Sequence, residues 1–225
     1  MRKDNLRGME VGNDGVAVIR ILNPPVNALA PPILAGLKEK YAEAMSRNDV
    51  KAIVLTGEGG RFSGGFDISV LELVHQTGDI SKLPDVSVQL VCSIIEDAKK
   101  PSVVDIEGLA LGEELLTVAR RWALDISERR KPWISSLQKT SKLGSLAESH
   151  KVIQAAREQA KRTAPNMPQH QACLDAVEEG IVFGGYSGVL KEVKLFNELV
   201  LSDTSRGLVH FFFSQRAISK EIFEV

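Results

Sequence analysis

The stretch with the clearest chemical potential is rich in glycine and runs from Gly57 to Asp67, as Gly-Glu-Gly-Gly-Arg-Phe-Ser-Gly-Gly-Phe-Asp. The apolar, β-branched run before it, 52–56, predicts a buried strand, and the residues from Ile68 onward predict the start of a helix. Glycine has no Cβ, so a ligand can approach the backbone closely in such a connection. The free N–H groups at a helix start are also good donors to an anion. The stretch therefore predicts a site at which main-chain donors stabilise negative charge.

Two common phosphate-binding patterns do not fit these glycines. A dinucleotide fingerprint would need glycine at position 62, which is Phe62. A P-loop would end in Gly-Lys-Ser/Thr, and that ending is absent from the sequence. A purely structural turn without a ligand stays open as the plain alternative.

The segment Phe62-Ser63-Gly64-Gly65-Phe66-Asp67 resembles the Phe-Ser-(Ala/Gly)-Gly-x-Asp motif of the crotonase (enoyl-CoA hydratase/isomerase) superfamily. The resemblance implies that the backbone N–H of Phe66 is one of two donors that polarise a thioester carbonyl. It also implies an acyl-CoA pocket beside this motif, formed by Gly64, Gly65, Phe66, Asp67 and Ile68.

A second part of the family's pattern begins at Lys100-Pro101 and leads to the run Gly108-Leu109-Ala110-Leu111-Gly112. In the family, two further glycines and a catalytic Glu follow, so Gly112 would start the second oxyanion turn. Here Glu113 and Glu114 follow instead. Adjacent helical residues point about 100° apart, and acidic residues are favoured at a helix N-terminus. We therefore interpret Glu113 and Glu114 as helix-start residues rather than as substitute catalytic groups.

The resemblance extends over nearly the whole chain to the plant-type peroxisomal multifunctional β-oxidation proteins, in which a hydratase domain precedes a dehydrogenase domain. It covers two blocks, residues 9–112 and 113–220, and implies that a family segment is missing between them. That segment would carry both catalytic Glu residues. The resemblance thus implies an enoyl-CoA hydratase/isomerase-like part that binds acyl-CoA or enoyl-CoA thioesters but has lost hydration activity.

The alternative is a non-catalytic splice or gene-model variant, acting as a weak acyl-CoA binder or as a helical interaction module. No cofactor is expected beyond the CoA of the substrate, and the sequence has no NAD fingerprint. The family implies a peroxisomal or glyoxysomal location. The C-terminus lacks the family's peroxisomal address, so we expect a cytoplasmic protein if this chain is expressed alone.

The hydrophobic pattern predicts an α/β fold with an all-helical C-terminal region, and the resemblance implies that the α/β part is a partial crotonase-like ββα spiral. The expected domains are residues 1–112, a truncated α/β core, and residues 113–225, a helical region. An Asp-Gly turn at 14–15 predicts a hairpin. The other expected elements are strands at 52–56 and 102–107 and helices at 33–46, 86–97, 113–128, 146–163, 168–179, 188–202 and 203–217.

Composition excludes several classes of protein. The 225 residues carry a net charge of −1 with 44% hydrophobic residues, so neither nucleic acid nor an anionic membrane is an expected partner. No run of about 20 apolar residues predicts a membrane span. Cys92 and Cys173 are expected to be reduced thiols, and Glu72 and His75 lack the further ligands that a metal site needs.

Two further expectations follow from the missing segment and from one unusual residue. Removal of core elements exposes apolar faces, so a homo-oligomer is one expected state. Asp105 lies in a strand that should be buried, where a carboxylate is costly unless it is paired.

Overall fold

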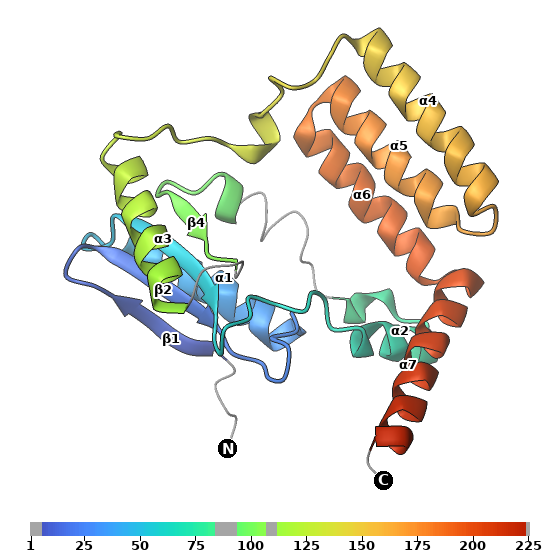
Figure 1. Ribbon diagram of the computed structural model, residues 1–225, viewed down its shortest axis with the longest axis horizontal. Helices are drawn as coiled ribbons and strands as arrows, with labels where there is room; N and C mark the ends of the chain where they lie inside the picture. The colour runs from blue at the N-terminus through green and yellow to red at the C-terminus, as the bar shows by residue number, and fades with distance from the viewer. Residues whose placement is uncertain (1–5, 84–93, 107–111, 224–225) are drawn as a thin grey trace. The chain divides into compact units, whose positions relative to one another are not determined.

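The computed structural model describes residues 6–83, 94–106 and 112–223 (Figure 1). The chain divides into two compact units, the first made of Met1–Asp67 with Pro84–Ser136 and the second of Ile68–Leu83 with Leu137–Val225. Residue 112, the expected domain boundary, lies inside the first compact unit. The division of the chain into two domains at this residue stays a prediction.

The first unit is built on a four-stranded sheet with the order β1-β2-β3-β4. The strands are β1 (Leu6–Val11), β2 (Val16–Ile21), β3 (Ala52–Gly57) and β4 (Ser102–Val104). β1 and β2 form the predicted antiparallel hairpin, and β2, β3 and β4 run parallel. Gly15, at φ +83°, supplies the left-handed conformation of the hairpin turn.

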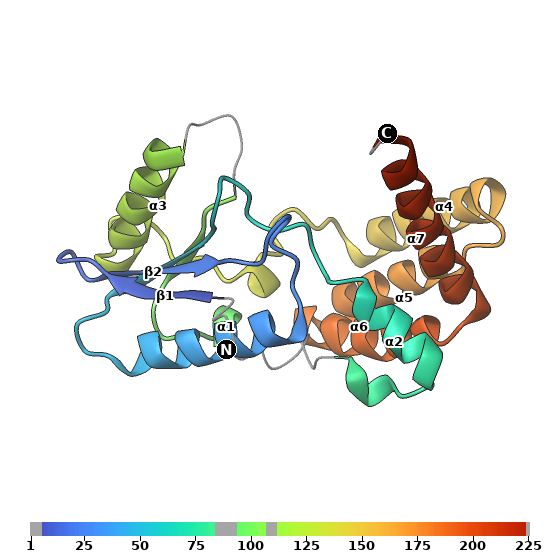
Figure 2. The same ribbon diagram turned by 90° about the horizontal axis from the view of Figure 1, so that it is seen from below.

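Helices cover both faces of this sheet: α1 (Pro31–Ser46) on one and α3 (Gly112–Ser127) on the other (Figure 2). Ile19 and Ile53 pack with Ile33 of α1, whereas Val18 and Val54 pack with Ala123 of α3. A parallel strand covered on both sides needs an unbroken apolar sequence, which explains the run at 52–56. The predicted helices 33–46 and 113–128 are confirmed within one or two residues at their ends.

On the α1 face, the hydroxyl of Tyr41 lies 2.7 Å from Ser102 Oγ of β4. Burial raises the pKa of Tyr41 to about 12, although the Ser102 hydrogen bond acts in the opposite direction. This buried polar contact ties the helix that precedes β3 to the strand that follows it.

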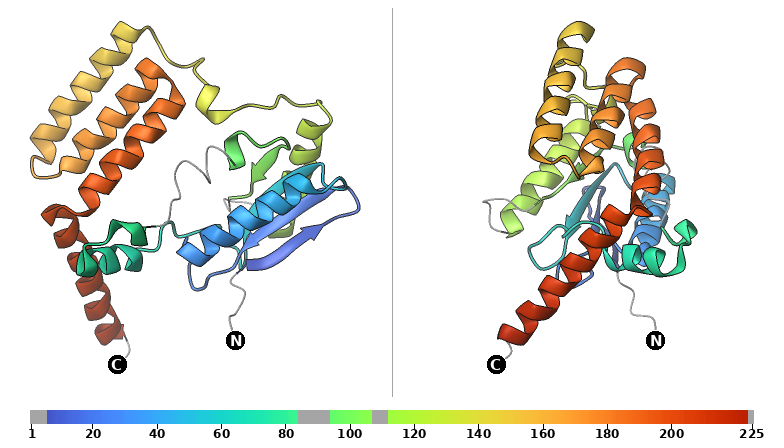
Figure 3. Two further views of the ribbon diagram at one scale, coloured as in Figure 1. Left: turned by 180° about the vertical axis from the view of Figure 1, so that it is seen from behind. Right: turned by 90° about the vertical axis from the view of Figure 1, so that its right-hand side faces the viewer.

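The second unit is helical in its described residues, as the sequence predicts for the C-terminal region (Figure 3). Its helices are α2 (Ser69–Thr77), the short η1 (Ile80–Lys82), α4 (Leu146–Thr163), α5 (Pro168–Phe183), α6 (Gly185–Val200) and α7 (Asp203–Phe223), with η3 (Ser136–Gln138) leading into it. The capping box predicted at Ser145 is formed: Ser145 Oγ accepts from the Glu148 N–H at 3.3 Å.

Three predicted helix ends are wrong. The structure begins α6 at Gly185 rather than near 188 and continues α7 to Phe223 rather than to about 217; the third is the end of α5. We expected α5 to stop at Gly180, but it continues to Phe183, and the positive φ of +97° falls on Gly184. Gly180 instead permits close helix packing, since a Cβ placed on Gly188 of α6 would lie 2.8 Å from the Gly180 Cα. A glycine in a helical pattern has two uses, and only the packed structure distinguishes them.

Other expectations fall on residues whose structure is not described. Most of the predicted helix 86–97, including Cys92, and the glycine-rich turn from Gly108 to Leu111 lie outside the described residues. Within the described residues, no helix is both long and apolar enough to cross a membrane. The same residues contain no group of three side chains suited to hold a metal ion.

Candidate functional site

The glycine-rich stretch connects β3 to α2, as the sequence predicts, and is hydrogen-bonded to the connector that follows β2. Leu29 N–H donates to Gly65 O at 2.8 Å, and Asp67 N–H donates to Leu29 O at 3.4 Å. These two bonds make an isolated parallel bridge between Leu29 and Phe66. The connector thus acts as a one-residue strand that fixes the backbone on either side of Phe66.

This bridge determines the direction of the Phe66 N–H. In a parallel bridge, the bonded groups belong to the residues on either side of the paired one, which here are Gly65 and Asp67. The N–H of Phe66 therefore points away from Leu29. Among the described residues it donates to no acceptor of the protein, and its role as a donor to a ligand stays a prediction.

The side chain of Asn27 forms hydrogen bonds with the same loop. Asn27 is 4% exposed and has a φ of +53°, a conformation that Asn tolerates better than most residues. Its Nδ2 donates to Glu58 O at 2.9 Å and to Arg61 O at 2.7 Å. The main-chain carbonyl of Asn27 accepts a hydrogen bond from the Ser63 hydroxyl at 2.7 Å. No local sequence pattern predicts these roles of Asn27 and Ser63.

Two glycines of the stretch are required by its geometry. A Cβ on Gly57 would lie 1.8 Å from Arg61 O, because the chain turns back on itself there. Gly65 has a φ of +90°, which other residues rarely adopt. The shape of the turn therefore explains why glycine stands at these two positions. This explanation is compatible with a ligand at the Phe66 N–H.

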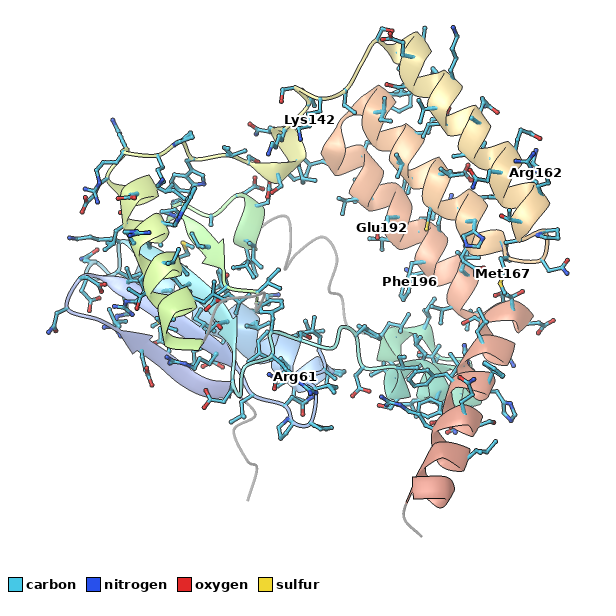
Figure 4. All side chains as sticks on the ribbon, viewed as in Figure 1. Arg61, Lys142, Arg162, Met167, Glu192 and Phe196 are labelled. Carbon is cyan, nitrogen blue, oxygen red and sulfur yellow. The ribbon has the colours of Figure 1, made fainter. Side chains whose placement is uncertain are left out.

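Two cavities of the first unit share part of this loop, including Arg61, whose side chain is labelled in Figure 4. We call the first the glycine-loop cavity: it has a volume of about 340 Å³ and is lined by Val26, Arg61, Phe62, Ser63, Gly64 and Ile106. We call the second the strand-end cavity: it has a volume of about 360 Å³ and is lined by Arg20, Thr56, Asp105, Leu115, Leu116 and the loop 57–62.

The structure places the predicted site residues in three groups. Gly64 lines the glycine-loop cavity, and Gly65, Phe66 and Asp67 form the bridged segment next to it. Ile68 precedes the first residue of α2 and belongs to the second unit. These assignments to an acyl-CoA pocket stay predictions.

The structure describes Gly112, the predicted start of the second oxyanion turn, and the two glutamates after it less fully. Gly112 is the first residue of α3, and Glu113 and Glu114 follow in its first turn. Their positions fit the interpretation as helix-start residues, but their side chains lie outside the described part of the chain. The second oxyanion turn therefore also stays a prediction.

Asp105 is the one buried carboxylate in the described part of the chain, with 7% of its surface exposed. It opens into the strand-end cavity, where Oδ2 accepts from the Thr56 hydroxyl at 3.2 Å. Its neighbour Ile106 lines the glycine-loop cavity. The buried carboxylate therefore shares a cavity with residues 57–62 of the loop but not with Ser63 and Gly64, which line the other cavity.

A profile of the family described as "Enoyl-CoA hydratase/isomerase" matches residues 11–183. That match covers most of the chain, so the protein belongs to the enoyl-CoA hydratase/isomerase family, as its sheet, glycine loop and bridged Phe66 suggest.

The individual relatives are longer proteins. The chain is 46% identical to the "Peroxisomal fatty acid beta-oxidation multifunctional protein AIM1" of Arabidopsis thaliana. It is 47% identical to the "Peroxisomal fatty acid beta-oxidation multifunctional protein" of Oryza sativa subsp. japonica. Both alignments cover 94% of this chain but only 40% of the relative. A solved enoyl-CoA hydratase/isomerase family protein from Hyphomonas neptunium is 31% identical over 46% of this chain and 40% of its own, with a TM-score of 0.40.

The lengths of these alignments bear on the missing segment. The alignment with the Arabidopsis protein spans 287 positions, although it contains 94% of a chain of only 225 residues. About 75 positions of the relative therefore have no counterpart in this sequence. That these positions form one segment missing after Gly112 stays a prediction.

Proposed function

We propose that this chain binds acyl-CoA thioesters at the Phe66 N–H and does not hydrate enoyl-CoA at an appreciable rate. The observation that carries the proposal is the Leu29–Phe66 bridge, which leaves the Phe66 N–H directed away from the connector. In this family the equivalent group polarises the thioester carbonyl, and losing one such donor costs roughly 10²–10³ in rate.

The loss of hydration rests on the carboxylates. Adding water to a conjugated thioester requires groups that accept and donate protons beside the substrate. The only buried carboxylate among the described residues, Asp105, faces the strand-end cavity rather than the glycine-loop cavity. The sequence also lacks the family's Gly-Gly-Gly-x-Glu continuation after Leu111. Binding without turnover is the expected outcome.

Two measurements test these parts separately. Turnover of crotonyl-CoA, followed by loss of enoyl absorbance, should be at or near the uncatalysed rate. A rate close to that of an intact hydratase would refute the loss of activity. Calorimetric titration with a saturated acyl-CoA should show binding that Phe66→Pro weakens at least tenfold, because proline removes the donor.

A matched substitution makes the binding test specific. Phe66→Leu changes the aromatic side chain but keeps the N–H, so it should retain affinity within about threefold. Equal loss in both variants would mean that the side chain, and not the backbone donor, holds the ligand.

The second candidate function is that of a helical interaction module. It is favoured by large apolar side chains on the helices of the second unit, among them Val152 at 69%, Phe183 at 71% and Phe211 at 59% exposed. Faces of this kind commonly mark sites of association. A chain that binds no acyl-CoA but associates through these helices would favour this candidate. The relatives are named as peroxisomal or glyoxysomal proteins, and we propose the same location for this chain.

A further inference from the structure

Three polar residues from the ends of neighbouring strands line the strand-end cavity: Arg20, Thr56 and Asp105. Arg20 of β2 lies opposite Thr56 of β3. Thr56 lies beside Asp105, which follows β4, and donates to its carboxylate at 3.2 Å. All three residues are at the carboxyl ends of parallel strands, the edge at which open α/β sheets commonly bind ligands. Leu115 and Leu116 of α3 and Phe62 of the loop contribute apolar walls.

The carboxylate of Asp105 is incompletely paired. It is 7% exposed, and the Thr56 hydroxyl is its one donor among the described side chains. At 3.2 Å this bond is longer than the usual 2.7–2.8 Å for an O–H···O bond. Arg20 does not neutralise it, since its guanidinium is directed to Glu10 at 2.8 Å and Glu58 at 3.8 Å. A buried carboxylate without a cationic partner is costly.

We propose that the strand-end cavity binds a small organic ammonium ion that donates to Asp105. Its volume of about 360 Å³ lies within the roughly 300–1,000 Å³ of small-molecule sites. An ammonium group would complete the pairing of Asp105 while an apolar body packs against Leu115, Leu116 and Phe62.

The other ligand classes fit this cavity less well. Arg20 and Arg61 line the cavity together with Glu58 and Asp105. Arg20 is directed to Glu10 and Glu58, and Arg61 is exposed, so the buried charge without a cationic partner is the carboxylate of Asp105. A metal ion would need more ligating side chains than the described residues bring together. The site differs from the proposed thioester contact: Asp105 lines the strand-end cavity and not the glycine-loop cavity, although the two cavities share Arg61 and Phe62.

The test uses the full chain and three probes of similar shape but different charge: benzylammonium, benzyl alcohol and benzoate. Backbone amide shifts in two-dimensional NMR locate binding, and titration gives the affinity. We expect benzylammonium to shift amides of 56–61 and to bind at least tenfold more tightly than the other two. Tighter binding of benzoate, or equal binding of all three, would overturn the proposal.

Substitution then tests the role of the carboxylate. Asp105→Asn keeps the size of the side chain and should weaken benzylammonium binding at least tenfold. Glu39→Gln, the same charge change at an exposed position of α1, should leave it unchanged. Unaltered binding in folded Asp105→Asn would also overturn the proposal, and if that variant does not fold, the three-probe comparison still decides. Acyl-CoA affinity should be the same in both variants, so failure here is distinguishable from failure of the thioester proposal.

Discussion

At the scale of single residues, Asn27 contributes most to the shape of the candidate site. Its amide group joins two carbonyls of the glycine loop to the connector, and its Oδ1 accepts from the Asn23 N–H at 3.0 Å. The Phe66 N–H depends on this arrangement because the connector also carries its bridge partner, Leu29. The donor that the family implies is thus held in place by a residue that the motif does not contain.

We therefore predict that Asn27→Ala lowers the free energy of unfolding by about 2–4 kcal/mol, since it leaves buried carbonyls without donors and places alanine at positive φ. Asn27→Gly removes the same hydrogen bonds without the backbone strain. It should cost about 1 kcal/mol less than alanine. Urea denaturation of both variants measures the two terms. A cost below about 0.5 kcal/mol for both would show that the amide is not a structural link.

At the scale of elements, the informative feature is that α3 completes the first unit. Its sequence begins at the junction where the family pattern breaks, yet Ala119 and Ala123 pack on β2 and β3. A polar contact reinforces this packing: Arg120 Nη2 lies 2.6 Å from Asp14 Oδ1 in the hairpin turn. Partial burial raises the pKa of Asp14, but the hydrogen bonds from Arg120 and the Val16 N–H and the charge of Arg120 outweigh burial and lower the pKa below its usual value.

This contact predicts a pH dependence. A carboxyl group whose pKa is lowered by folding adds stability above its unfolded pKa, near 3.9, and loses it as the pH falls through the folded value. Asp14→Asn should therefore cost about 0.5–1 kcal/mol at pH 6, since the pair is partly exposed. The cost should shrink below pH 4. Arg120→Met should show no additional cost when combined with Asp14→Asn. Additive losses, or a cost independent of pH, would contradict the predicted coupling.

At the scale of the whole molecule, the chain has two compact units of different character. The first has a layered core with many fully buried apolar residues, whereas the second keeps many large apolar side chains exposed. Polar contacts hold part of the second unit together: Arg157 of α4 pairs with Asp175 at 2.7 Å and with Glu178 at 2.8 Å on α5.

The exposed helices predict self-association. Sedimentation velocity should show a sedimentation coefficient that rises with concentration in the micromolar range. Phe183→Ser combined with Phe211→Ser should reduce this rise, because it removes two side chains that are 71% and 59% exposed. Lys161→Ser, a polar change on α4, serves as the control. A monomer at every concentration would exclude the homo-oligomer expected from the sequence.

The sequence alone determined the local structure where one signal dominated. The Asp-Gly turn, the apolar run at 52–56, the capping box at Ser145 and the strand-to-helix course of the glycine stretch each depend on neighbouring residues, and the structure confirms them. The family could also be identified from the sequence, because the motif residues keep their spacing along the chain.

Only the tertiary structure decided which distant residues share a site. The bond between Asn27 and Arg61, the row of Arg20, Thr56 and Asp105, and the packing of Gly180 against Gly188 join residues from different elements. Such contacts follow from strand register and helix packing, to which every element contributes and which no local pattern encodes. For the same reason, the sequence could show that Asp105 was unusual but not which cavity it faces.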